Sequence, residues 1–428
     1  MLFNSFQYLV FLPLVVCLYY VLPQRWRWVL LLAASYYFYM VWNAKYIILI
    51  IISTLIDYFA SIMMEKQGTK KGRRLFMLLS LFSNLGLLFV FKYFNFFSDA
   101  YSQLVTAITH HSASAHRLDI LLPMGISFYT FQTLSYTIDV YRGHRPAEKH
   151  LGYFALYVSF FPQLVAGPIE RSDRLLPQLH AKHTLTYRQT LDALMRIMWG
   201  FFKKVVIADR LAVLVNTVYN NVTGYDGIYL YIATIGFAIQ IYCDFSAYSD
   251  IAIGSAKLLG VELMENFKMP YFSRSVGEFW SRWHISLSTW FRDYLYIPLG
   301  GNRNRKEWMT YRNLLIVFVV SGLWHGANWT FILWGLLHGV YLVVEKLAER
   351  QKKIHPEGVF AKIKIPMVIQ QIVTFVLVLV AWVLFRANNI GEAAYIFSHL
   401  SLGNTLSMFR DGHLSFGLDN QDIILLAG

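Results

Sequence analysis

His325 lies in an apolar stretch, Ser321-Gly-Leu-Trp-His-Gly-Ala-Asn-Trp-Thr330. An ionisable side chain at bilayer depth costs several kcal/mol unless it lines a cavity or finds a partner, so it marks a candidate functional site. A neutral imidazole in a dry pocket can act as a general base toward a hydroxyl or thiol that attacks an acyl carbonyl. The alternative is a histidine that is only hydrogen-bonded within a helical bundle. We take His325 as the first candidate for catalysis.

The residues near His325 in the sequence indicate which side chains could act with it. Trp324 flanks it, and Asn328, three residues later, is expected at a neighbouring position of the same helix. His338 follows thirteen residues after His325, which is about 220° around an ideal helix. We therefore expect His338 to face elsewhere and to be structural.

A second histidine lies upstream in an aromatic segment. Residues 277–293 predict one amphipathic helix that contains His284, although a helix lying in the membrane interface would show the same pattern. The turn-rich basic loop 294–306 follows. It could neutralise the phosphates of a nucleotide-containing donor, or simply anchor the cytoplasmic side.

Motifs of the common soluble enzymes are absent from the sequence. His284, His325, Asp244 and Asp250 have no spacing typical of metal ligands, so we expect no metal site. The sequence also lacks a G-x-S-x-G elbow, a P-loop lysine motif and a dinucleotide fingerprint.

The elements that must position these residues are membrane helices. The chain of 428 residues is 56% hydrophobic and 15% charged, which predicts an all-α polytopic membrane protein. We expect roughly ten to twelve membrane-embedded segments, some of them re-entrant. Long apolar runs occupy residues 8–22, 46–63, 75–91, 228–242, 314–344 and 367–385.

The net charge of +13 does not indicate a nucleic-acid partner, because the basic residues lie in short loops between apolar segments. The clusters at 66–74 and 346–364 predict the cytoplasmic face. Residues 99–115 contain no Lys or Arg and are expected on the outside.

We predict one integral membrane domain over residues 1–428. It consists of N-terminal helices (1–97), a core that bears the motifs (98–345) and C-terminal helices (346–428). Polar residues, Gly and Pro interrupt apolar sequence at 122–132, 161–170 and 240–250, which predicts irregular backbone around an internal cavity. Residues 421–428 read as the opening of a further membrane helix, so we expect the full protein to continue.

Several motifs together resemble the membrane-bound O-acyltransferase family. They are Gly322-Leu-Trp-His-Gly326, Phe279-Trp-Ser-Arg-Trp-His284 and the segments 122–142, 162–168, 243–250 and 298–303. The similarity is greatest to the bacterial branch that acetylates alginate and peptidoglycan. The D-alanyl transfer proteins of teichoic acid modification are similar too.

The resemblance implies a helical bundle with a tunnel through the bacterial cytoplasmic membrane. The family's invariant histidine corresponds to His325, and a more variable polar position corresponds to His284. In this branch acetyl-CoA is the expected donor, with no permanently bound cofactor. A partner of the SGNH hydrolase type would complete transfer to an extracytoplasmic polysaccharide.

We further expect six residues to bind or orient the substrates: Asn328, Asp244, Ser246 and Trp324 near the histidines, and Arg303 and Arg305 at the phosphates of coenzyme A. Transfer of D-alanine from a carrier-protein thioester is the nearest alternative. A lipid or glycan transporter would also contain polar residues at mid-membrane, although the sequence has no inverted repeat. A non-catalytic scaffold for a polysaccharide synthase is the third alternative.

Overall fold

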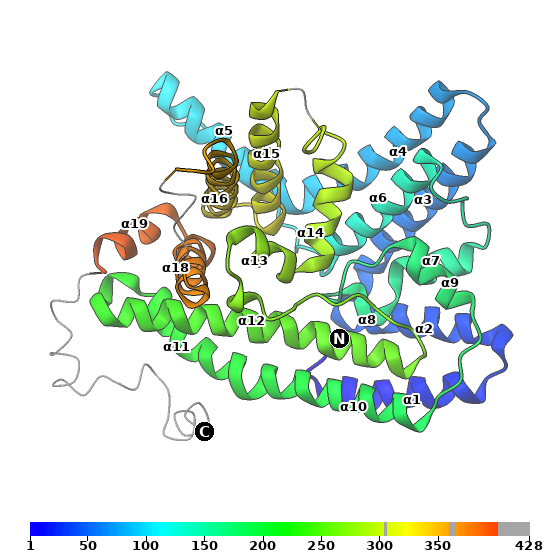
Figure 1. Cartoon of the computed structure of the whole chain (residues 1–428). Coiled ribbons are helices and arrows are strands. Elements are labelled where there is room, and N and C mark those ends of the chain that lie inside the picture. Colours follow the sequence, from blue (N-terminus) through cyan, green and yellow to red (C-terminus); the bar gives the residue numbers. More distant parts are fainter. Residues whose placement is uncertain (304–305, 359–364, 401–428) are drawn as a thin grey trace. The chain divides into compact units, whose positions relative to one another are not determined.

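The computed structural model describes residues 1–303, 306–358 and 365–400, and every regular element in these ranges is helical (Figure 1). By packing, the chain forms two compact units. The first comprises Met1–Trp199 and Tyr248–Glu265, and the second Gly200–Ala247 and Asn266–Gly428. The predicted all-α architecture is confirmed. A single domain, the tunnel and continuation beyond residue 428 stay predictions, and residues 401–428 lie outside the described residues.

The first unit is a bundle of long helices followed by shorter ones. Its helices are α1 (Phe6–Val21), α2 (Gln24–Asn43), η1 (Ala44–Tyr46), α3 (Ile47–Lys66), α4 (Lys70–Leu88), η2 (Phe89–Tyr93), α5 (Phe94–Thr109), α6 (Ile126–Arg142), α7 (Leu151–Ser159), α8 (Phe161–Leu164), α9 (Ser172–His180) and most of α10 (Tyr187–Phe201).

A buried polar network joins α3, α4 and α6, which lie side by side (Figure 1). Asn84 Nδ2 on α4 donates to both carboxyl oxygens of Asp57 on α3, at 2.9 Å each. Ser80 Oγ, one turn before Asn84, donates to Asp57 Oδ1 and lies 3.2 Å from Thr137 Oγ1 on α6. Because buried polar groups need partners, this network fixes the relative rotation of the three helices.

The second unit contains both candidate histidines. Its helices are η3 (Phe202–Ala208), α11 (Asp209–Tyr219), η4 (Val222–Gly224), the first part of α12 (Gly227–Leu258), η5 (Pro270–Phe272), α13 (Val276–Arg282), α14 (Ile285–Phe291), η6 (Arg292–Tyr296), α15 (Glu307–His325), α16 (Trp329–Ile354), α18 (Met367–Arg386) and α19 (Ile390–Ser398). A core rich in aromatic side chains, including Phe279, Trp334 and Trp382, packs between these helices.

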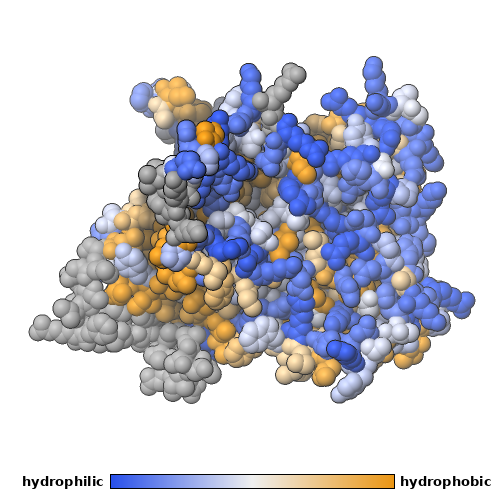
Figure 2. Space-filling model, viewed as in Figure 1, coloured by the Kyte–Doolittle hydropathy of each residue, from blue (hydrophilic) through white to orange (hydrophobic). Residues whose placement is uncertain are grey.

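Five helical segments in the described part of the chain are long and apolar enough to cross a membrane. They are Gln24–Lys66, Lys70–Thr109, Gly227–Leu258, Trp329–Ile354 and Met367–Arg386, and α1 is a shorter apolar helix. Large apolar side chains of α18, such as Ile369, Ile372 and Val376, are exposed, and Figure 2 shows hydrophobic surface in this region. A lipid environment would cover such surface. The chain is a multi-pass membrane protein, while the count of ten to twelve embedded segments stays a prediction.

Three local predictions are wrong. The predicted helix over 277–293 is broken at Trp283–His284, between α13 and α14. The apolar run 314–344 is likewise two helices, because α15 ends at His325 and α16 begins at Trp329. Residues 240–250 were expected to be irregular, yet they form a continuous part of α12.

Candidate functional site

His284 occupies the sharp turn between α13 and α14. Its φ of 43° and ψ of 54° are left-handed, a conformation that is uncommon for a residue with a side chain but enriched in Asn, Asp and His. The turn is fixed from both sides: Ser288 N donates to His284 O (3.0 Å), and Ile285 N donates to the backbone oxygen of Asn266 (3.0 Å). The strained turn holds a fully buried imidazole in one position.

Asn266, which the sequence did not suggest, orients the His284 ring. Asn266 Oδ1 accepts from Ser286 N (3.2 Å) and Ser286 Oγ (2.8 Å), and it lies 3.3 Å from His284 Nδ1. Because a carbonyl oxygen can only accept, Nδ1 of His284 must be the donor. The neutral ring therefore carries its proton on Nδ1 and presents Nε2 as a base.

The surroundings of His284 favour this neutral form. Phe245 packs edge-on against the ring, with centroids 4.6 Å apart. Burial, and secondly the charge that His325 would carry, lower the pKa of His284 well below its ordinary value of 6.5. His284 lies in none of the candidate spans. At neutral pH its imidazole is therefore uncharged.

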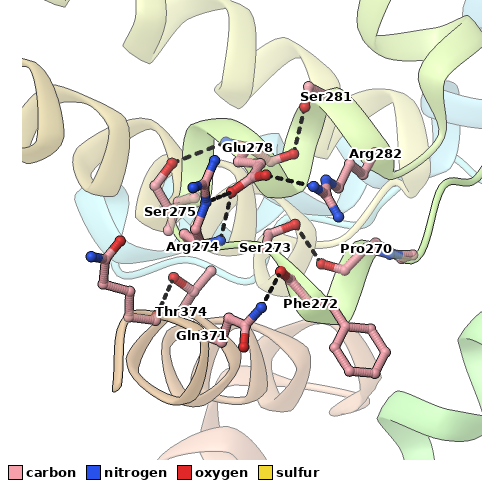
Figure 3. Close-up of polar contacts among 12 residues, drawn as sticks. Pro270, Phe272, Ser273, Arg274, Ser275, Glu278, Ser281, Arg282, Gln371 and Thr374 are labelled. Carbon is pink, nitrogen blue, oxygen red and sulfur yellow. Dashed lines mark hydrogen bonds and ion pairs between the residues drawn. The ribbon is translucent and has the colours of Figure 1, made fainter. Parts of the chain in front are cut away.

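Helix α13, which leads into His284, is held at its start by hydrogen bonds of its N-cap Ser275 and of Glu278 (Figure 3). Ser275 Oγ accepts from Glu278 N (3.1 Å), and Glu278 in turn accepts from Arg274 N (2.7 Å). The Glu278 carboxylate also pairs with Arg282, and these contacts lower its pKa. The preceding turn is tied to α18, because Gln371 Nε2 donates to Phe272 O (3.0 Å) (Figure 3).

His325 is the last residue of α15 and lies among three aromatic rings. The centroids of Trp324 and Trp334 are each 5.0 Å from that of His325, and Phe385 is 5.3 Å away. Trp324 also lies 6.1 Å from His284. The structure thus brings His284, Trp324 and His325 into one cluster, although 41 residues separate the two histidines along the chain.

A cavity of about 390 Å³ lies between the elements that carry the two histidines, lined by residues of α13, α14, η6, α15 and α16. Its α15 residues are Leu314, Val317, Phe318 and Ser321. They follow the three- and four-residue spacing of one helix face, which His325 continues four residues after Ser321. On α14 the lining begins at Ile285, the residue after His284. Neither histidine lines the cavity itself; His284 directly precedes one lining residue, and His325 follows another by one helical turn.

Asn328 does not share a helix with His325 as predicted. It is the N-cap of α16, where its Oδ1 accepts from Thr330 N (3.1 Å) and its Nδ2 donates to Asn388 O (2.8 Å). The angular argument for His338 fails for the same reason. His338 is nevertheless fully buried, and its Nδ1 accepts from Trp280 Nε1 at 3.2 Å.

Asp244 and Ser246 contact two lysines that were not among the predicted site residues. Lys204 Nζ pairs with Asp244 (2.5 Å) and Asp209 (2.8 Å), and the buried Lys203 donates to Ser246 Oγ at 2.7 Å. The sequence itself could have indicated these residues, because two adjacent lysines in an apolar stretch are as unusual as an intramembrane histidine. Both lysines lie on η3, a π-helical turn, an element found often at functional sites.

The basic loop before α15 is only partly described. Arg303 is exposed, and its backbone N–H donates to Gly300 O at 3.1 Å. Arg305 lies outside the described residues. Binding of coenzyme A phosphates by this loop stays a prediction.

Comparison with known proteins identifies the family of this chain. The model of the membrane-bound O-acyltransferase family matches residues 31–386. The chain is 41% identical to the "Probable alginate O-acetylase AlgI" of Pseudomonas aeruginosa over 405 residues, 92% of this chain and 73% of that protein. It is 36% identical to the peptidoglycan O-acetyltransferase of Helicobacter pylori, over 87% of this chain and 72% of that protein.

A more distant relative is the teichoic acid D-alanyltransferase of Bacillus subtilis, which is 28% identical over 54% of this chain and 60% of its own length. The family match covers more than half of the chain, and the greater identities belong to proteins named as O-acetylating enzymes. The chain therefore belongs to the membrane-bound O-acyltransferase family and is an O-acyltransferase.

Proposed function

We propose that this protein moves an acetyl group from cytoplasmic acetyl-CoA, through the bacterial cytoplasmic membrane, toward a hydroxyl of an extracytoplasmic polysaccharide. The observation that carries the proposal is the cluster in which Trp324 contacts both His284 and His325, with His284 held in its neutral, Nδ1-protonated form by Asn266. The names of the similar alginate and peptidoglycan O-acetylating proteins support acetyl as the group and a polysaccharide as the final acceptor.

In the proposed reaction His325 takes the proton of the acceptor hydroxyl as its oxygen attacks the thioester carbonyl. The new C–O bond forms, the C–S bond breaks, and the protonated His325 passes the proton on to the leaving thiolate of coenzyme A. His284 Nε2 assists as a second base or hydrogen-bond acceptor. The products are the acetyl ester and free coenzyme A, so atoms and charge balance.

The remaining predicted residues act around this pair. Trp324 separates the two imidazoles and excludes water. Asn328 acts indirectly, because it caps the helix that presents Trp334 to His325. Asp244 and Ser246 act through Lys204 and Lys203, while Arg303 and Arg305 meet the phosphates of coenzyme A. An SGNH-type partner outside the membrane receives the acetyl group and completes the transfer.

The test is turnover of radiolabelled acetyl-CoA by the purified protein in nanodiscs, with and without the extracytoplasmic partner. We expect His325→Ala to lower turnover by about 10²- to 10⁴-fold, the usual contribution of a general base. His355→Ala is the matched control, because His355 is exposed just after the end of α16. Equal turnover by the two variants would remove His325 from the mechanism.

The similarity to a teichoic acid D-alanyltransferase favours one second candidate, D-alanyl transfer from a carrier-protein thioester. The same preparation distinguishes the two donors. If only a D-alanyl carrier thioester loses its acyl group in a His325-dependent reaction, the acetyl-CoA proposal is wrong and this second candidate replaces it.

A further inference from the structure

A second cavity lies in the first unit, and its lining residues come from the end of α3, the start of α4, and the end of α6 with the segment after it. Its volume is about 350 Å³, and it is lined by Glu65, Arg73, Val140 and residues 143–146. Two arginines, one histidine (His144) and one glutamate thus line the same space. None of these residues contributes to the histidine pair of the second unit.

Both arginines are held in place by contacts that leave part of each guanidinium available. Arg73 Nη2 donates to Val140 O (3.0 Å) and Tyr141 O (2.8 Å), which caps the end of α6. Arg145 Nε donates to Pro146 O (3.3 Å), and its guanidinium carbon lies 5.3 Å from the centre of the Tyr136 ring. The two side chains are therefore positioned before any ligand arrives.

Each guanidinium also has a buried nitrogen without a hydrogen-bond partner among the described residues, Nε of Arg73 and Nη1 of Arg145. Neither arginine forms an ion pair with a carboxylate in that part of the chain. Glu65, the acid in the lining, instead accepts from Ala147 N at 3.2 Å, and His144 lies 3.5 Å from Asp139. Two arginines that line one cavity without a carboxylate partner in the described ranges favour an anionic ligand in it.

We propose that this cavity binds a phosphate group, held by the side chains of Arg73 and Arg145, with the exposed His144 beside it. Phosphate oxygens accept from several directions at once and match arginine geometry. The phosphate belongs to a lipid headgroup or to a soluble phosphate compound. The site lies beside the cluster 66–74, which the charge pattern assigns to the cytoplasmic face, where basic pockets between helices recruit anionic lipids.

The test compares Arg145→Gln with Arg74→Gln. Both variants lose one positive charge in the same region, but Arg74 is exposed and does not line the cavity. Arg145→Gln is preferred to Arg73→Gln because Arg73 also caps α6.

Two measurements distinguish the source of the phosphate. In the lipid arm, native mass spectrometry measures how much phosphatidylglycerol the protein retains after release from nanodiscs of phosphatidylcholine and phosphatidylglycerol. In the soluble arm, inorganic phosphate is added to phosphatidylcholine nanodiscs at constant ionic strength and the Tm is measured.

Loss of one charge-assisted contact should lower affinity about tenfold. If Arg145→Gln reduces phosphatidylglycerol retention by about that factor while Arg74→Gln does not, the ligand is a lipid phosphate. If instead phosphate raises the Tm of the wild type and of Arg74→Gln but not of Arg145→Gln, the ligand is soluble. Equal behaviour of the two variants in both arms would overturn the site, as would the absence of any effect of either probe on the wild type.

Discussion

At the scale of single residues, the contact that does most to define the site is made by Asn266. Its side-chain oxygen serves three donors, and two of them belong to Ser286 just after the left-handed turn. The same oxygen therefore fixes the backbone at His284 and the tautomer of its ring. A change at Asn266 should alter chemistry and folding together unless the oxygen is retained.

Asn266→Asp retains an acceptor at the same place, whereas Asn266→Ala leaves buried donors without a partner. We expect Asn266→Ala to cost about 1–3 kcal/mol of stability per donor left unsatisfied and to reduce kcat for acetyl transfer. Asn266→Asp should keep most of the stability and a measurable kcat. Thermal unfolding and acetyl-CoA turnover of both variants in nanodiscs check this. If Asn266→Asp and Asn266→Ala behave alike, the acceptor oxygen does not have this role.

At the scale of elements, α15 and α16 depend on two glycines that let their backbones approach. A Cβ built at Gly322 would lie 2.1 Å from Phe331 O, and one at Gly335 would lie 2.1 Å from Phe318 O. Both neighbours are backbone atoms, which cannot rotate away. Small residues commonly permit such close approach between membrane helices. The placement of His325 against Trp334 therefore depends on this pair.

Gly335→Ala should force α15 and α16 apart, with a loss of about 1–3 kcal/mol of stability, the usual effect of overpacking. Because His325 ends α15, acetyl-CoA turnover should fall as well. Gly86→Ala in α4 is the matched control, since a Cβ there meets nothing within 4 Å. Thermal unfolding and turnover of the two variants give the comparison. Similar stabilities for the two would show that the close approach is not required.

The elements that the sequence predicted well are those defined by uninterrupted apolar runs. The run 367–385 became α18 and 46–63 became α3, each within three residues at either end. Length and hydropathy determine such helices locally. The break after His325 could also have been predicted from the sequence. Gly is typical just after the end of a helix, as at Gly326, and Asn is typical of an N-cap, as at Asn328.

The turn at His284 could not be predicted in the same way. The left-handed residue of this turn is a histidine and not a glycine, so no local residue type indicates the turn. Asn266, which stabilises the turn, lies 18 positions upstream. Lys203 and Lys204 contact α12 across about 40 positions, so their partners could not be read from local spacing either. The sequence predicted which residues to examine, whereas long-range contacts decide how they are oriented.

At the scale of the whole molecule, the direction of the chain through the membrane follows from one long segment. Lys70–Thr109 is helical throughout, with a π-helical turn at Phe89–Tyr93. From Lys70 to Lys92 the rise is about 33 Å, close to the roughly 30 Å of the hydrocarbon core. The charge pattern predicts that the basic start of this segment lies on the cytoplasmic face and that residues 99–115 lie outside.

This geometry predicts that residues 71 and 112 lie on opposite sides of the membrane. In a background with Cys17→Ser and Cys243→Ala, Ser112→Cys should react with a membrane-impermeant maleimide in intact spheroplasts. Lys71→Cys should react only after permeabilisation. Both positions are exposed, so access to the side chain is not limiting. Labelling of Lys71→Cys alone would invert the orientation and place the phosphate site outside, and labelling of both would mean that α4 does not cross.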